Sequence, residues 1–257
     1  MAAIRNRTRT LLAAGGAVLV AVAVSGCGGS DASDAPVEKK AFPLGGHTLT
    51  IDATNSRITL VPADVRDVQV SRQVDGWVFM GSGPDASWKM SGDTLKLEVK
   101  CKAVVSNCES RHSVKVPRGV AVKLNGNNGG VTASRFSSPL SLELNNGSIT
   151  VRDSSGPLDL NTDNGSITTQ RASAKSVSAH SNNGSVRLGL SAQPDKVDVE
   201  TDNGGITIEL PKAGSAYAVT ARSHNGKVDV GVPTDKSSAH VVKARSSNGR
   251  IAVRTAN

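Results

Sequence analysis

The sequence predicts an all-β protein folded as a β-solenoid, a parallel β-helix-like stack of short coils that each contain one Asn-Gly dipeptide. The aligned Asn-Gly recurs seven times at intervals of 18, 18, 19, 20, 22 and 23 residues, the length of one short supersecondary unit. Valine or leucine stands six residues before each of these asparagines, and valine or isoleucine stands three residues after it. Only six aromatic residues occur, and nothing after the N-terminal segment has extended helical periodicity.

The first 26 residues have the composition of a bacterial export signal. Three arginines precede an uncharged apolar stretch, Leu11 to Val24, which is too short to span a bilayer comfortably as a helix. Residues 24–27, Val-Ser-Gly-Cys, resemble the bacterial lipobox, in which a signal peptidase cuts before a cysteine that carries the lipid. The alternative is cleavage after the Ala-Val-Ala of residues 21–23, which would release the protein.

The lipobox resemblance divides the chain into three segments. Residues 1–26 are the lipoprotein signal peptide, residues 27–41 are the lipidated Cys27 with a flexible tether, and residues 42–257 are the repeat-containing β-solenoid domain. The tether is expected because its residues are small, polar and charged. The resemblance implies anchoring to the outer face of the bacterial cytoplasmic membrane, where a diacyl-modified cysteine supplies the two chains that stable anchoring requires.

An irregular insertion is expected at residues 75–93, where the chain concentrates its large apolar side chains around a Gly/Pro/Ser turn. These side chains are Trp77, Phe79, Met80, Trp88 and Met90. We interpret the insertion as a flap that buries them over an end or side of the solenoid, because solenoid ends require capping against edge pairing. The alternative is an exposed loop whose aromatic residues anchor a partner.

Two further cysteines, Cys101 and Cys108, favour a structural disulfide, because an exported chain meets an oxidising environment. The bridge would close a short loop and stabilise the fold by roughly 2 to 3 kcal/mol. A metal pair is the weaker alternative, since His112 is the only nearby imidazole and no second cysteine pair exists. We therefore expect neither a metal nor a cofactor.

The repeated asparagines predict a ladder of side-chain amides along one corner of the stack. Equivalent residues of stacked strands lie about 4.8 Å apart, so each amide can donate to the oxygen of the next. Each such hydrogen bond would contribute roughly 1 kcal/mol if buried. Glycine after each asparagine would supply a bend that a β-carbon would resist. The expected ladder consists of Asn55, Asn128, Asn146, Asn164, Asn183, Asn203, Asn225 and Asn248.

An antiparallel β-meander or barrel is the alternative fold, with every Asn-Gly in a type I′ hairpin turn. A hairpin has no reason to select asparagine over aspartate or glycine at every turn, whereas a stacked amide ladder has one. Serine or threonine also stands two residues before the later asparagines, where it would form a second polar ladder. These identities favour the solenoid.

An eighth copy of the repeat opens the domain as LTIDATNSRITL at residues 49–60, where Ser56 replaces the glycine. The lipobox, the tether, this opening segment, a cysteine pair before a strand ending in Val-Lys-Val-Pro, and the tandem Asn-Gly coils together resemble the bacterial putative-adhesin domain of unknown function. The resemblance covers roughly residues 45 to 257 and implies a β-solenoid on the cell surface. It carries over no catalytic or ligand residues.

A polysaccharide-acting β-helix enzyme is the rival function. Outward carboxylates just before the asparagine column could hold Ca²⁺ or act as an acid/base pair. The same columns contain serine, histidine, asparagine and threonine, which is typical of a solvated face, and residues 94–257 hold only two aromatic residues that could form a sugar platform. We therefore expect a non-enzymatic, adhesin-like binding or scaffold protein, with a structural spacer or signalling-accessory role as a further alternative. The candidate carboxylates are Asp159, Asp163, Asp198, Glu200 and Asp202.

Charge is unevenly distributed along the repeats. The mature protein carries a net charge of +5, because removing the signal takes three arginines and no acid from a chain of +8. Leu140 to Leu210 contains nine acidic and five basic residues, whereas Pro211 to Asn257 contains two acidic and eight basic ones. If the coils stack in sequence order, the last coils therefore form a basic tip.

Such a tip would attract an anionic cell-wall polymer or another envelope protein by a salt-sensitive mechanism. The alternative is that these charges discourage end-to-end pairing of solenoids. Nucleic acid is not expected as a partner, because export removes the chain from it and no aromatic residues interleave with the charges. The tip residues are Arg222, Lys227, Lys243, Arg245, Arg250 and Arg254.

Overall fold

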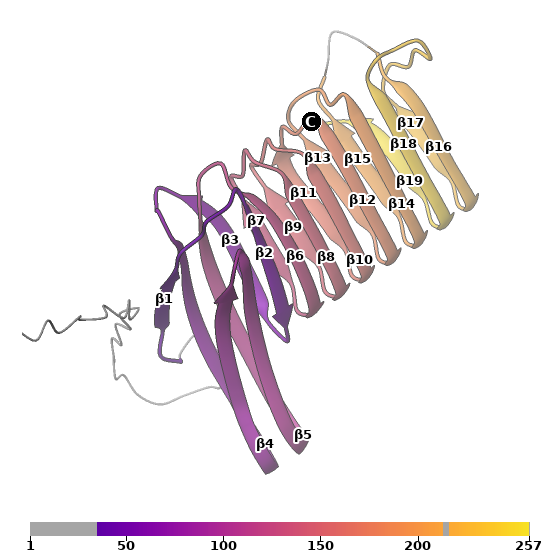
Figure 1. The fold of residues 1–257 in the computed structure, drawn as a ribbon. Helices are drawn as coiled ribbons and strands as arrows, with labels where there is room; N and C mark the ends of the chain where they lie inside the picture. The colour runs from indigo at the N-terminus through magenta and orange to yellow at the C-terminus, as the bar shows by residue number, and fades with distance from the viewer. Residues whose placement is uncertain (1–34, 213–215, 257) are drawn as a thin grey trace, which may run out of the picture.

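The computed structural model describes residues 35–212 and 216–256, including their side chains except at residues 76–83 and 101–109. This part of the chain forms nineteen strands and no helix, and hence no helix long and apolar enough to cross a membrane. Figure 1 shows a stack of coils that runs from a long hairpin, β4 and β5, to a final coil at the opposite end. Each coil consists of two strands joined at the asparagine corner.

The first strands of the eight coils pair side by side in one row, and the second strands pair in another. We call them the first row and the second row. The first row contains, in spatial order, β2 (Thr48–Thr54), β6 (Ala121–Asn128), β8 (Leu140–Asn146), β10 (Leu158–Asn164), β12 (Ser176–Asn183), β14 (Lys196–Asn203), β18 (Val241–Asn248) and β16 (Ala218–Asn225). The second row contains β3 (Arg57–Ala63), β7 (Val131–Ser134), β9 (Ile149–Arg152), β11 (Ile167–Ala172), β13 (Val186–Leu190), β15 (Ile206–Leu210), β19 (Ile251–Thr255) and β17 (Val228–Gly231).

Within each row the strands of neighbouring coils run parallel, with equivalent residues directly opposite one another. Asn164, for example, pairs with Asn146 on one side and with Asn183 on the other. This pairing confirms the predicted β-solenoid. The antiparallel meander is wrong for the coils, because their neighbouring strands run in the same direction.

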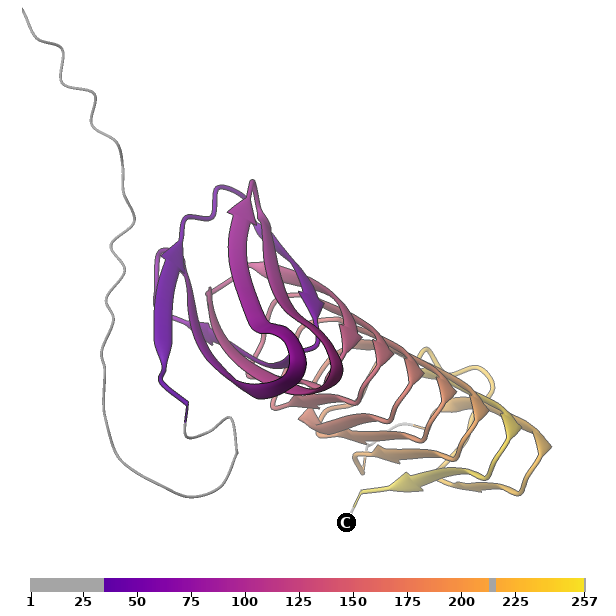
Figure 2. The same ribbon diagram turned by 90° about the horizontal axis from the view of Figure 1, so that it is seen from below.

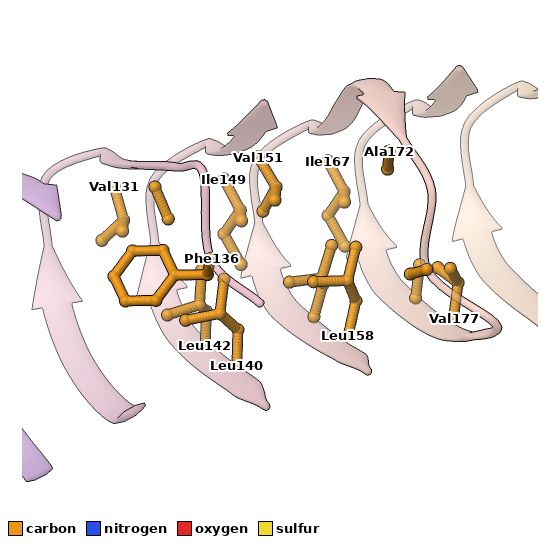
Figure 3. Packing of buried hydrophobic residues seen from close by; sticks show 14 of the residues in the cluster. Val131, Phe136, Leu140, Leu142, Ile149, Val151, Leu158, Ile167, Ala172 and Val177 are labelled. Carbon is orange, nitrogen blue, oxygen red and sulfur yellow. The ribbon is translucent and has the colours of Figure 1, made fainter. Parts of the chain in front are cut away.

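Alternate side chains of both rows point between the rows and form one continuous core. In one coil, Leu140 and Leu142 of β8 and Ile149 and Val151 of β9 are each at most 1% exposed. Figure 3 shows how these residues follow one another from coil to coil, with Phe136 beside them. Burying each such side chain contributes roughly 1.5 to 3 kcal/mol, so the period-two pattern of the repeats supplies most of the stability.

The last two coils do not stack in sequence order, which corrects the order assumed for the basic tip. β14 pairs with β18 and β18 pairs with β16, so the coil of residues 241–255 lies inside the coil of residues 218–231. The second row follows the same order, β15, β19 and β17. After β15 the chain therefore continues in a coil two positions outward, and the coil of β18 and β19 then fills the position between them.

A hairpin of two long strands covers the N-terminal end of the stack. β4 (Val68–Ser91) and β5 (Thr94–Pro117) pair antiparallel along their length with one irregularity. The start of β5 also pairs with β2 and its end pairs with β3, so β5 occupies the position of a coil before the first one. Figure 2 shows both strands curving together between these contacts. The expected irregular insertion at 75–93 is therefore wrong, because these residues belong to a paired hairpin.

The outer side of this hairpin pairs with β1 (Glu38–Phe42), so the last four residues assigned to the tether belong to the fold. The Phe42 and Trp88 rings meet edge to face with centroids 6.3 Å apart, and the Arg72 guanidinium lies 4.2 Å from the Trp88 ring centroid. Trp88 and Met90 pack against the core, as a capping flap requires. The side chains of Trp77, Phe79 and Met80 lie outside the described residues.

The predicted lipid anchor and disulfide stay predictions, because residue 27 and the side chains of Cys101 and Cys108 lie outside the described residues. The backbone before and after the cysteine pair meets at one corner of the first coil. Asn55 Nδ2 donates to the carbonyl of Val99 at 3.2 Å, and Ser110 Oγ donates to the carbonyl of Asn55 at 2.8 Å.

Candidate functional site

The corner of every coil carries an asparagine whose amide bonds to the asparagine of the neighbouring coil. Seven hydrogen bonds join the eight asparagines, with Nδ2 to Oδ1 distances of 2.8 to 3.2 Å. Each inner amide donates once and accepts once, which a carboxylate cannot do. The ladder follows the crossed-over order of the last coils and runs through Asn55, Asn128, Asn146, Asn164, Asn183, Asn203, Asn248 and Asn225.

All eight asparagines are exposed at this corner, so the condition of burial that a contribution of about 1 kcal/mol per hydrogen bond requires is not met. Water competes for exposed amides, and each hydrogen bond therefore contributes less than the roughly 1 kcal/mol of a buried one. The ladder's main effect is to fix the register of the corners, while the core supplies the stability.

Buried hydroxyl groups support the corner from inside. Thr162 Oγ1 donates to the carbonyl of Gly147 at 2.9 Å, and Ser181 Oγ donates to that of Gly165 at 2.9 Å. The same bond is repeated by Thr201, Ser223 and Ser246. The expected second ladder is therefore a row of hydroxyl-to-carbonyl bonds between coils, each of which satisfies a turn carbonyl.

Glycine follows the asparagine because neighbouring coils approach closely at that point. A β-carbon at Gly184 would lie 1.9 Å from the carbonyl oxygen of Gly165, and one at Gly165 would lie 2.0 Å from that of Gly147. Neither Gly184 nor Gly165 has a positive φ. The close approach of two backbones, rather than a left-handed bend, thus selects glycine at these two corners.

The first corner has Ser56 in place of glycine because β5, and not another coil, lies next to it. Ser56 Oγ lies 2.6 Å from His112 Nδ1 on β5, and the two residues are only 4% and 2% exposed. Burial, with a smaller effect of the Arg72 charge, lowers the pKa of His112 to about 4. The contact between Ser56 and His112 therefore joins the cap to the first coil at a buried position.

Replacing Asn164 with aspartate should destabilise the protein by about 1 kcal/mol. Aspartate can accept the bond from Asn183 but cannot donate to Asn146, and it adds a charge next to Asp163. Denaturant midpoints of Asn164→Asp and of the control Ser166→Asp would measure the difference. Equal midpoints would show that the ladder adds nothing beyond turn formation.

Three of the predicted tip residues lie on the outer side of the first row. Lys243 and Arg245 stand opposite Asp198 and Glu200 of β14, and Arg222 follows Arg245 on the terminal coil. Arg222 and Arg245 line a groove of 340 Å³ together with Glu200. Because β18 lies next to β14, the acidic Asp198 and Glu200 stand beside the basic Lys243 and Arg245.

The other three tip residues form ion pairs elsewhere. Arg254 lies on the second row, and its guanidinium contacts the Glu209 carboxylate at 2.5 Å. Arg250 and Lys227 stand just after the corner, and both contact the carboxylate of Asp229. Hydrogen bonds from Arg250 and then Lys227 hold the pKa of Asp229 below its usual value. The six residues are therefore divided between two faces and do not form one basic tip.

The outward carboxylates considered for catalysis or Ca²⁺ bond to polar neighbours. Asn161 Nδ2 donates to Asp159 at 3.3 Å, and Asn182 Nδ2 donates to Asp163 at 3.0 Å. Among the described residues, no group of three or more His, Cys, Asp or Glu side chains is placed to hold a metal ion. These contacts are typical of a solvated polar face.

A groove on the outer side of the second row was not predicted. It has a volume of 640 Å³ and lies over β11, β13, β15 and β19 around Gly189. The available signal was Gly189 itself, since an isolated glycine within a strand pattern indicates a bulge or a close approach.

The fold and its corner define a β-solenoid of stacked Asn-Gly coils closed at one end by a hairpin. The chain belongs to the Toastrack DUF4097 family, whose sequence model matches residues 47–256. This confirms the resemblance to the putative-adhesin domain of unknown function. None of the curated proteins matches the chain.

Three solved structures are similar to this chain at low sequence identity. A putative adhesin from Bacteroides fragilis has 15% identity and a TM-score of 0.49, with 84% of this chain and 96% of that chain covered. A putative adhesin from Parabacteroides distasonis has 14% identity and a TM-score of 0.46, with coverages of 85% and 98%. A putative cell adhesion protein from Clostridium sporogenes has 14% identity and a TM-score of 0.38, with coverages of 86% and 99%.

Proposed function

We propose that this protein is a non-enzymatic surface lipoprotein whose solenoid is an adhesin-like binding or scaffold domain on the outer face of the bacterial cytoplasmic membrane. The observation that carries the proposal is the regular stack of coils, which holds columns of exposed polar side chains at fixed intervals along a stiff core. A surface of this kind suits contact with an extended envelope polymer or protein. The outward carboxylates considered for catalysis include Asp159 and Asp163, which accept hydrogen bonds from Asn161 and Asn182.

The two ends of the solenoid support an orientation for this role. The N-terminal end is covered by β4 and β5 and by β1, which includes the last four residues of the predicted tether. At the other end, Val228 and Val230 of β17 are 36% and 43% exposed, whereas the equivalent Ile251 and Val253 of the next coil are at most 1% exposed. Seven coil-to-coil steps would place this open end roughly 34 Å beyond the first coil, pointing away from the membrane.

The lipid anchor is tested by the Cys27→Ala variant expressed as the full chain. Nearly all of the Cys27→Ala protein should be absent from the membrane fraction, because the diacylated cysteine supplies both lipid chains that hold the protein. The matched control is Ser30→Ala, which lies in the tether and should leave the membrane fraction unchanged. Equal retention of Cys27→Ala and the control would contradict the anchor.

The binding role is tested with the mature chain lacking Cys27 in a screen of glycans and envelope polymers. Retention of at least one envelope polymer by the folded domain, without cleavage, supports the proposal. Release of shorter saccharides would favour the enzyme instead. A folded domain that retains nothing would favour a spacer or signalling-accessory role.

A further inference from the structure

The unpredicted groove on the second row is built by a single glycine opposite a β-bulge. Gly189 of β13 stands in the outward column that holds Glu209 on the next coil. On its other side the register of β11 shifts between Thr169 and Ala172, so that two residues lie opposite this glycine. The missing side chain leaves the column open at this coil, and the bulge widens the space.

Fixed contacts hold the bulge in this shape. Arg171 has a φ of 50°, and its guanidinium donates two hydrogen bonds to the Asp153 carboxylate at 2.7 and 2.8 Å. The backbone N–H of Gly189 donates to Thr169 Oγ1 at 3.2 Å. A bulge fixed by local bonds typically redirects side chains or opens a surface at a functional site.

Three arginines line the groove, and two of them, Arg171 and Arg254, form ion pairs within the described part of the chain. Arg254 contacts Glu209 at 2.5 Å, and Arg171 is held by Asp153. Arg187 is exposed, and no ion pair or hydrogen bond joins its guanidinium to another group in the described part of the chain. A guanidinium is the side chain best suited to bind a carboxylate or phosphate through two hydrogen bonds.

Neutral hydrogen-bonding groups surround this cation. The hydroxyl-bearing Thr168 and Thr207 stand in register on either side of Arg187, and Gln170 lies next to the gap. Leu190, Pro211 and Ala256 add an apolar edge. The groove thus offers an anion site, sugar-like hydrogen-bond partners and an apolar strip, within the size range of small-molecule sites.

We propose that this groove binds an acidic saccharide, a sugar unit that carries a carboxylate or a phosphate. Arg187 holds the anionic group, while the Thr168 and Thr207 hydroxyls, the Gln170 amide and the Glu209 carboxylate take the sugar hydroxyls. The site rests on the proposed function, because it names the ligand class and the residues through which the solenoid would contact an envelope polymer.

The test measures binding of the folded mature chain lacking Cys27 to three probes by titration calorimetry. A galacturonate oligomer supplies carboxylates, a glycerol-phosphate oligomer supplies phosphates, and a neutral oligosaccharide of equal length is the control. At least one acidic probe should bind at least tenfold more tightly than the neutral one. A poly-glutamate peptide that binds as tightly as the best saccharide would overturn the saccharide assignment.

Two variants locate the site. Arg187→Gln should weaken binding of the acidic probe at least tenfold, and Gly189→Gln should abolish it by filling the gap. Gly231→Gln is the control for a glutamine added to the same column at the open end, where a β-carbon would lie 3.8 Å from the nearest carbonyl oxygen. A β-carbon at Gly189 would lie 3.1 Å from the carbonyl oxygen of Thr169, so the denaturation midpoint of Gly189→Gln is measured to show that the fold is kept. Arg245→Gln on the first row controls for loss of surface charge. Both controls should bind like the unmodified protein.

Unchanged affinity of Gly189→Gln and Arg187→Gln, when an acidic polymer still binds, would overturn the groove but leave the surface-binding role intact. Equal weakening by Arg187→Gln and Arg245→Gln would likewise overturn it, since binding would then follow total charge. Binding of an envelope polymer that contains no acidic sugar, with none of either acidic probe, would overturn the ligand class alone.

Discussion

Replacing Gly184 with alanine should lower the free energy of unfolding by about 3 kcal/mol or more. The added β-carbon would lie 1.9 Å from the carbonyl oxygen and 2.5 Å from the carbonyl carbon of Gly165, and backbone atoms cannot move aside as a flexible side chain could. The coils would have to separate at this corner. Separation would lengthen the amide bond from Asn183 to Asn164 and the hydroxyl bond from Ser181 to the carbonyl of Gly165.

Chemical denaturation of Gly184→Ala beside Gly231→Ala would measure this effect. A β-carbon at Gly231 would meet its nearest atom, the carbonyl oxygen of Val253, at 3.8 Å, so the control should stay within about 0.5 kcal/mol of the unmodified protein. Comparable stability of the two variants would mean that the corner glycines are selected by turn conformation and not by the approach of neighbouring coils.

The repetitive part of the fold could be predicted from the sequence because each coil makes the same contacts as its neighbour. Valine, leucine or isoleucine recurs at fixed offsets from each asparagine only if these positions face one core, and Val197 and Ile206 do so with at most 1% exposure. The identity of Asn164 and its equivalents predicted the amide ladder for the same reason. The close approach at Gly165 and Gly184 was not predicted, since the distance between coils is not visible in one repeat, whereas Gly129 has a φ of 115°, in line with the expected bend.

The order of the last two coils could not be predicted from their residues. Val219 and Val242 occupy equivalent positions, as do Ala221 and Ala244, so either coil fits against β14 equally well by its pattern. The contact between Glu209 and Arg254, which would be absent in sequence order, favours the crossover. The only signal in the sequence was the widening of the asparagine spacing to 22 and 23 residues.

The sequence predicted a capping flap, but the hairpin form of this cap and the groove were missed because both depend on departures from the repeat. Residues 75–93 pair with a segment later in the chain, so their strands follow no repeat. Gly189 alters a surface column without changing the core pattern around it. His112 was considered only as a neighbour of the cysteines, whereas its pairing with β4 and its contact with Ser56 bury it at the first corner.

This burial should make the stability of the cap depend on pH. The pKa of His112 is lowered from an ordinary value of 6.5 to about 4, so the folded protein binds fewer protons than the unfolded chain in this interval. The contribution of neutral His112 to the free energy of unfolding is therefore fully present above pH 6.5 and is lost as the pH falls towards 4. The lost free energy of unfolding amounts to about 3 kcal/mol at pH 4.

The histidine contribution is isolated by comparing the unmodified protein with His112→Gln at pH 7.5 and at pH 4. Glutamine keeps a hydrogen-bonding group opposite Ser56 but takes up no proton, so the unmodified protein should lose about 3 kcal/mol more than the variant between the two pH values. Carboxylates such as Asp153, whose pKa is lowered by hydrogen bonds from Arg171, titrate in both proteins and cancel in the difference. Hydrogen exchange at pH 4 should rise first in β4, β5 and the corner at Ser56, because protonated His112 would face the charge of Arg72 across the strand pair at a buried position. Parallel pH profiles of the two proteins would show that His112 is already solvated in the folded state and that its burial does not make the cap depend on pH.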